Sequence, residues 1–134
     1  MKRVFGDAHY FLALANPRDT DHRAALEFAR QWRGVVVTTR WILAEVADGL
    51  ASPLNRRLGV MLVEQVSREP RFRLVENSDA LFARGFDLYR CRADKEWSLT
   101  DCISFVVMAD EGLTDALTVD RHFSQAGFTA LLAR

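Results

Sequence analysis

Short β-branched or apolar segments alternate with longer segments of helical period along the whole 134-residue chain. The clearest strand is the β-branched run Val35–Thr38, and the helix predicted before it, over residues 21–32, carries one apolar stripe. Strands separated by helices require crossover connections, which favour parallel pairing with helices on both faces. The chain is therefore expected to belong to the α/β class, as a three-layer α/β/α sandwich around a central, mostly parallel sheet.

Periodicity, turn residues and helix caps predict the individual elements. Strands are predicted at residues 2–6, 35–38, 72–75, 117–119 and 128–131. Helical segments are predicted at 10–15, 21–32, 40–51, from Pro53 through Val66, after the cap Ser78 through Tyr89, from Ser98 through Ala109, and at 122–125. Asn16–Asp19 is predicted to be a turn.

The length fits one domain, residues 1–134, and the apolar fraction of 49% is enough for one core. No apolar run approaches the roughly 20 residues of a membrane-spanning helix, and no signal peptide is recognisable after Met1. A cytoplasmic protein without membrane contact is expected. The two cysteines, Cys91 and Cys102, form neither a metal-ligand pair nor a disulfide framework.

The charges balance, with 18 basic and 18 acidic side chains. This argues against a protein that coats nucleic acid through bulk charge, but it leaves room for a local basic patch. Only Lys2 and Lys95 are lysines, so the other sixteen basic residues are arginines. Because arginine holds phosphate bidentately, the composition is compatible with RNA contact.

Two acids directly follow predicted strands. Asp7 comes after the first one, and Asp120 comes after the one ending at Val119. In open parallel sheets, ligands bind outside the carboxyl ends of the strands. Both acids are therefore expected at the same edge of the sheet.

Two further acids border apolar helix faces. Glu45 is predicted mid-helix on the flank of a stripe that includes Val46, and Asp101 lies in the first turn of a helix whose same face continues to Phe105. Carboxylates are almost never fully buried unless they are paired or bound. No basic residue is placed to neutralise all four acids, whereas a divalent cation would.

Each acid also has a purely structural interpretation. Asp7 and Asp120 can cap the helical turns that follow them, and Glu45 can pair with Arg40. Asp101 fits a capping box at the start of its helix. Taken singly, the residues leave these alternatives open.

Together, the four acids lie in segments that resemble the PIN-domain family, in particular its short stand-alone members, which include VapC-type toxins. The family has an Asp after the first strand, a helical Glu after a Thr/Ser-containing start, an acid that opens a helix, and a Thr-x-Asp-x-x-Phe pattern. The matching segments are Val4–Asp7 with Phe11–Leu14, Thr38–Glu45, Ser98–Cys102, and Leu117–Phe123 continued by Ala126–Phe128. The turn Asn16–Asp19 with His22 is also similar to this group, so the resemblance covers essentially the whole chain.

The resemblance implies a metal-dependent endoribonuclease, with Asp7, Glu45, Asp101 and Asp120 as catalytic residues and as metal ligands, directly or through water. An all-carboxylate site selects hard cations, so Mg²⁺ or Mn²⁺ is implied. Such an ion supplies an activated water and offsets charge on the phosphate. An RNA substrate, an antitoxin protein and a homodimer are the partners expected. Candidate phosphate contacts are Arg40, Arg92, Lys95 and Arg121, with a solvated surface charge as the alternative for each.

The chain departs from the family pattern at one position. Members usually carry Ser or Thr after the first Asp, and here Ala8 is followed by His9. This favours an alternative function, a PIN-fold RNA- or protein-binding module with weak or lost catalysis, although the four acids oppose it. His9 is interpreted as a helix-surface histidine, with partial substitution for the hydroxyl as the alternative.

Two other enzyme classes fit less well. An aspartyl-phosphate phosphatase would need a second Asp two residues after the first, where this chain has His9. A P-loop enzyme would need a Gly-x-x-x-x-Gly-Lys run, which is absent.

Overall fold

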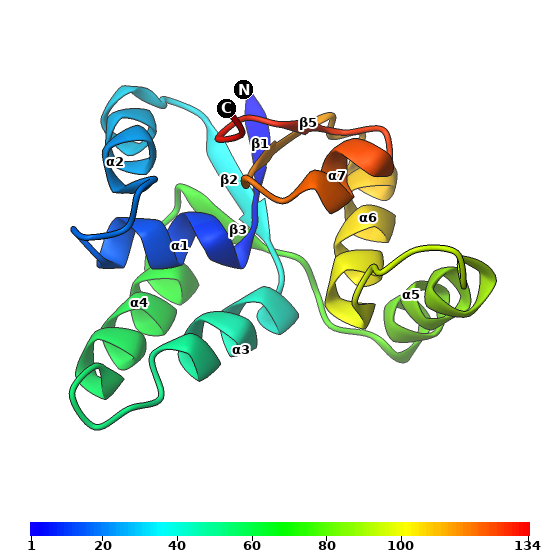
Figure 1. Cartoon of the computed structure of the whole chain (residues 1–134), viewed down its shortest axis with the longest axis horizontal. Helices are drawn as coiled ribbons and strands as arrows, with labels where there is room; N and C mark the ends of the chain where they lie inside the picture. Colours follow the sequence, from blue (N-terminus) through cyan, green and yellow to red (C-terminus); the bar gives the residue numbers. More distant parts are fainter.

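The computed structural model describes residues 1–134 and contains one five-stranded sheet in the order β3-β2-β1-β4-β5 (Figure 1). Every neighbouring pair of strands is parallel. The strands are β1 (Arg3–Gly6), β2 (Val35–Thr38), β3 (Phe72–Leu74), β4 (Asp115–Leu117) and β5 (Thr129–Ala130).

Seven helices cover the two faces of the sheet. The helices are α1 (Ala8–Ala15), α2 (His22–Gln31), α3 (Arg40–Gly49), α4 (Arg56–Arg68), α5 (Asp79–Cys91), α6 (Leu99–Glu111) and α7 (Arg121–Gln125). Helices α1 to α4 lie on one side and α5 to α7 on the other (Figure 1). The predicted three-layer α/β/α sandwich is confirmed, and the sheet is wholly parallel. None of these helices has both the length and the apolar character that a bilayer crossing requires.

The strands and helices share one apolar core. Phe5 of β1, Val37 of β2 and Leu117 of β4 are completely buried in the sheet layer. On the α5–α7 side, Ile103 of α6 packs against Gly85 of α5, where an added Cβ would overlap the Ile103 side chain and lie 3.1 Å from its Cα. The glycine is therefore needed for the close approach of these two helices.

The order of the strands creates a crevice between β1 and β4. Phe5 of β1 is paired with Val37 of β2 on one side and with Ala116 of β4 on the other. The chain thus extends the sheet from β1 toward β3 and then returns to the opposite side of β1. At such a switch point the connections leave in opposite directions, which opens a site at the carboxyl edge.

Several predicted boundaries were wrong. β4 ends at Leu117 rather than Val119, so Asp120 comes three residues after the strand instead of directly after it. The ladder stops because Asp7 N–H bonds the Leu117 carbonyl while Thr118 N–H turns back to the Ala116 carbonyl. α1 begins at Ala8, two residues before the predicted start at residue 10.

α4 begins at Arg56 and not at Pro53. The residues before it form a turn, in which the Asn55 and Arg56 N–H groups both bond the Ser52 carbonyl. This geometry delays the helix by three residues.

Candidate metal centre

Asp7 lies at the end of β1, in the crevice. Its residue is 7% exposed, and Thr118 Oγ1 donates a 2.7 Å hydrogen bond to its Oδ2. The side chain makes no capping hydrogen bond to α1, so the interpretation of Asp7 as a helix cap was wrong. Burial, reinforced by the charges of Asp101 and Asp120, raises the pKa of Asp7 from 3.8 to about 6, despite the opposing hydrogen bond from Thr118.

Thr118 connects Asp7, at the end of β1, with Asp120, in the segment after β4. Its completely buried hydroxyl donates to Asp7 and accepts a 3.0 Å hydrogen bond from Asp120 N–H. Sequence reasoning quoted this threonine within the Thr-x-Asp pattern but gave it no role. Its position two residues before Asp120 was the available signal, since Thr side chains often bond the backbone two residues on.

Asp101 both completes the capping box of α6 and contacts His122. It completes the predicted capping box of α6, because its Oδ2 accepts from Ser98 N–H at 3.1 Å while Ser98 Oγ accepts from Asp101 N–H. The same Oδ2 lies 3.0 Å from His122 Nδ1. Burial and, more weakly, the charge of Asp120 raise the pKa of Asp101, against the lowering hydrogen bonds from Ser98 and His122.

Asp120 caps α7 as its structural interpretation predicted, with Oδ1 accepting from His122 N–H at 2.9 Å. The His122 imidazole then turns into the centre, where Nδ1 is 3.3 Å from the same Asp120 oxygen. Oxygen atoms of Asp101 and Asp120 and a ring nitrogen of His122 all lie within 4.8 Å of one another. Sequence reasoning did not single out His122 as a site residue.

Glu45 projects from α3. The residue is exposed, beside the fully buried Val46, and so is more exposed than the predicted position on the flank of the apolar stripe implied. No ion pair with Arg40 forms. Partial burial, followed by the charges of Asp7 and Asp101 and then those of Asp48 and Asp120, raises the pKa of Glu45 to about 7.

The structure thus brings the four predicted acids into one electrostatic unit, although they come from four separate segments of the chain. The charges of the other three acids each raise the pKa of Glu45, and the charges of Asp101 and Asp120 raise the pKa of Asp7. Within 4.0 Å, the only basic partner of any of them is His122. No lysine or arginine neutralises the group, so a concentrated negative charge remains at the carboxyl edge of the sheet.

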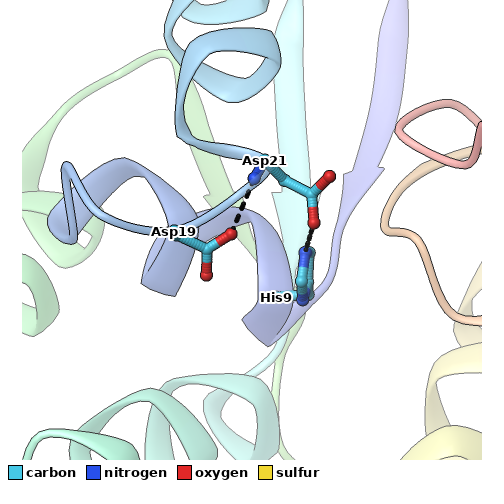
Figure 2. A group of neighbouring side chains, drawn as sticks. All are labelled: His9, Asp19 and Asp21. Carbon is cyan, nitrogen blue, oxygen red and sulfur yellow. Dashed lines mark hydrogen bonds and ion pairs between the residues drawn. The ribbon is translucent and has the colours of Figure 1, made fainter.

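A second histidine–carboxylate cluster lies beside the start of α1 (Figure 2). His9 Nε2 is 2.9 Å from Asp21 Oδ2, and Asp19 Oδ1 accepts from Asp21 N–H at 2.8 Å. The other Asp21 oxygen accepts from Arg134 at 2.9 Å. These bonds join α1, the loop before α2 and the C-terminal residue. His9 therefore pairs with Asp21 and makes no hydrogen bond to Asp7, so it does not replace the hydroxyl that Ala8 lacks.

The candidate phosphate contacts lie on different elements. Arg92 and Lys95 line a cleft of about 780 Å³ that also contains Ser98, the cap of α6. Arg92 bonds Asp94 and lies over the Trp97 ring, with 5.0 Å between the guanidinium carbon and the ring centroid. The other two, Arg40 at the start of α3 and Arg121 next to Asp120, are exposed.

The sequence pattern of the PIN domain matches residues 4–129. The chain belongs to the PIN-domain family. This match includes all four acids of the centre.

Two solved or curated relatives are similar over nearly the whole PIN domain. The 23S rRNA-specific endonuclease VapC20 of Mycobacterium tuberculosis is 27% identical over 128 residues, which are 93% of this chain and 95% of VapC20. The crystal structure of VapC20, described as a Sarcin-Ricin loop cleaving toxin, superposes with a TM-score of 0.86, at 26% identity and the same coverage of both chains. FitAcB from Neisseria gonorrhoeae shares the fold, with a TM-score of 0.62, 18% identity, and 95% of this chain and 94% of FitAcB covered.

Proposed function

We propose that this chain is a metal-dependent endoribonuclease, acting as the toxin of a toxin–antitoxin pair. The observation that carries the proposal is that the carboxylates of the four acids interact electrostatically and have no basic partner within 4.0 Å other than His122. Such a group repels itself and is compatible with a folded, ionised state when a cation is shared among its members. The similar protein VapC20, which is named for RNA cleavage, supports the same chemistry.

The residues present fit a hard divalent cation. Carboxylate oxygens dominate the donor set, which favours Mg²⁺ or Mn²⁺ over softer metals. We assign Asp7, Glu45, Asp101 and Asp120 as the residues that would hold the ion, directly or through water. When bound, the ion would supply an activated water and stabilise negative charge on the scissile phosphate.

The chain's own contribution is to fix and orient these carboxylates. Thr118 holds Asp7 Oδ2 and the Asp120 backbone through a single buried hydroxyl, so β1 and the loop after β4 keep one relative position. The capping box fixes Asp101 at the start of α6. Preorganised ligands of this kind reduce the reorganisation needed during the reaction.

We propose structured RNA as the substrate class. Arg92 and Lys95 line a cleft that also contains Ser98, and Ser98 is hydrogen-bonded to Asp101. A balanced net charge of zero suits contact with one local segment better than bulk coating of RNA. The sarcin–ricin loop of 23S rRNA is the first RNA to test, because VapC20 is named for cleaving it.

The test is RNA cleavage by purified protein. We expect cleavage in Mg²⁺ or Mn²⁺, with loss of activity in chelator and in Asp7→Asn and Asp101→Asn, while Asp19→Asn, an acid of the second cluster, keeps activity. A labelled sarcin–ricin hairpin and an unrelated hairpin of equal length distinguish selective from general cleavage. Activity that persists in both site variants would place the chemistry elsewhere.

The alternative, a weak or inactive PIN-fold binding module, is favoured by one observation, Ala8 in place of the usual hydroxyl residue. Against it, the Thr118 hydroxyl already bonds Asp7 at 2.7 Å. RNA binding without cleavage, at protein concentrations where the Asp7→Asn variant binds equally well, would support the alternative.

Further parts of the proposal concern assembly and location. We propose that residues 1–134 act as one domain, in the cytoplasm, where structured RNA is accessible. A homodimer and an antitoxin partner are proposed because the chain exposes aromatic side chains along α5, namely Phe82, Phe86 and Tyr89. Light scattering of the free chain, and of the chain co-expressed with the product of any small adjacent gene, would test both partners.

A further inference from the structure

We infer that His122 supplies a nitrogen ligand, Nδ1, to the cation at this centre, between the carboxylates of Asp101 and Asp120. The inference rests on the proposed metal-dependent function and deepens it. It changes the ligand set from carboxylates alone to carboxylates plus one imidazole, and it predicts which divalent ions the site prefers.

The first observation is the position of Nδ1 relative to two oxygens. It lies 3.0 Å from Asp101 Oδ2 and 3.3 Å from Asp120 Oδ1. Ligand atoms in neighbouring positions of an octahedral site, each about 2.1 Å from the ion, are separated by about 3 Å. Nδ1 therefore already lies at the spacing of an adjacent ligand from each of the two oxygens.

The second observation is that Nδ1 has two carboxylate oxygens as neighbours, more than one proton can serve. Asp101 Oδ2 also accepts from Ser98 N–H, and Asp120 Oδ1 also accepts from His122 N–H. A single Nδ1–H points well at only one of two acceptors. With the proton on Nε2, the Nδ1 lone pair and both carboxylates can serve one cation together.

The third observation is that the imidazole is held in place by the backbone around it. Asp120 caps α7 through His122 N–H, and Thr118 bonds the Asp120 N–H. The next residue, Phe123, is fully buried with its ring 5.0 Å from that of Phe105. His122 is thus fixed from both sides, as expected for a ligand rather than for a surface histidine.

The ligand set has a consequence for metal preference. Mg²⁺ strongly favours oxygen ligands, whereas imidazole raises the relative affinity of later divalent ions, including Mn²⁺. Loss of the imidazole should therefore weaken Mn²⁺ binding more than Mg²⁺ binding. A histidine that only oriented the carboxylates would weaken both by the same factor.

The experiment is pulsed electron paramagnetic resonance of Mn²⁺ bound to the full chain, with Mg²⁺ affinity measured by competition. In the wild type we expect nitrogen coupling to Mn²⁺, lost in both His122→Asn and His122→Gln. The Mn²⁺ dissociation constant should rise roughly 10–100-fold in these variants, and the Mg²⁺ constant by a clearly smaller factor. Far-ultraviolet circular dichroism of both variants checks that they fold.

The matched control is His9→Asn, the same substitution at a part-buried histidine that also bonds an aspartate (Figure 2). It should keep the nitrogen coupling and the Mn²⁺ affinity. Nitrogen coupling that disappears in His9→Asn, is absent from the wild type, or persists in both His122 variants overturns the inference. Equal weakening of Mn²⁺ and Mg²⁺ binding overturns it as well.

Failure of the proposed function gives a different result. If Mn²⁺ binding depends on Asp101 and RNA is cleaved, but no nitrogen couples to the ion, then only the role of His122 is wrong. If the wild type binds no Mn²⁺ that Asp101→Asn removes, the metal centre itself fails, and the inference falls with it.

Discussion

Replacement of Asp7 by Asn should stabilise the metal-free protein at neutral and alkaline pH. Asp7 is buried among other carboxylates, and its pKa is raised from 3.8 to about 6. Each pKa unit corresponds to about 1.4 kcal/mol, so the ionised form costs the folded state on the order of 3 kcal/mol. The amide keeps the side-chain volume and can still accept the Thr118 hydrogen bond. The pKa shift already contains the contribution of that bond to the ionised form, so the bond adds no separate loss.

The net gain is therefore on the order of 3 kcal/mol, which for a chain of this length corresponds to a rise in Tm of roughly 8–12 °C. The sign follows from linkage. A carboxyl whose pKa is raised on folding stabilises the folded state when protonated, and this contribution is lost as the pH rises through the folded pKa. The difference between variant and wild type should thus be near zero below pH 4, should grow between pH 4 and about 6, and should stay constant above about pH 7.

The assay is thermal unfolding in chelator across this pH range, followed by a second series in millimolar Mn²⁺. Because only the folded state holds the ion, Mn²⁺ should raise the Tm of the wild type more than that of Asp7→Asn. Asp19→Asn is the control, since that acid lies in the second cluster. The electrostatic reasoning would be refuted if Asp7→Asn were less stable than the wild type at pH 8 in chelator. It would also be refuted if the difference in Tm between the two proteins were the same at all pH values.

Three further substitutions test the scaffold around the centre. Thr118→Val removes the buried hydroxyl that bonds Asp7, so the free energy of unfolding in urea should fall by about 1–3 kcal/mol, and Thr118→Ser should recover most of it. Gly85→Ala should cost about 1–3 kcal/mol by overpacking at α6, whereas Gly59→Ala, whose added Cβ would meet its nearest neighbour at 3.2 Å, should cost clearly less. Ser98→Ala opens the capping box and should lower stability by about 0.5–2 kcal/mol, with RNA cleavage reduced because Asp101 loses its fixed position. Equal stabilities of Thr118→Val and Thr118→Ser, or of the two glycine variants, would contradict these contacts.

Local pattern was sufficient for the fold class. The β-branched run Val35–Thr38 became β2 with the predicted bounds, and Ser78 and Ser98 cap α5 and α6 as expected. These features depend on side-chain period and on capping within a few residues, so neighbouring residues suffice to specify them. Asp7 was placed correctly after β1 for the same reason.

Longer-range pairing decided the position of β4. Leu117, Thr118 and Val119 have the composition of a strand, but the last paired residue is Leu117, opposite Gly6 of β1. Thr118 leaves the ladder because its N–H turns back to the Ala116 carbonyl, and its hydroxyl then bonds Asp7, 111 residues earlier in the chain. Strand propensity depends on local residue type, so it cannot predict such a long-range contact.

The tertiary structure also determined the electrostatics of the four acids. The sequence by itself singled out the four acids as candidate ligands, through the order of their motifs, but it left each one open to a cap or ion-pair interpretation. Only the packing of α6 and α7 beside β4 brought His122 to Asp101, and only the fold placed Glu45 of α3 within the field of the other acids. Burial and charge proximity are properties of the assembled sheet edge, because they depend on which distant segments exclude water from the same crevice.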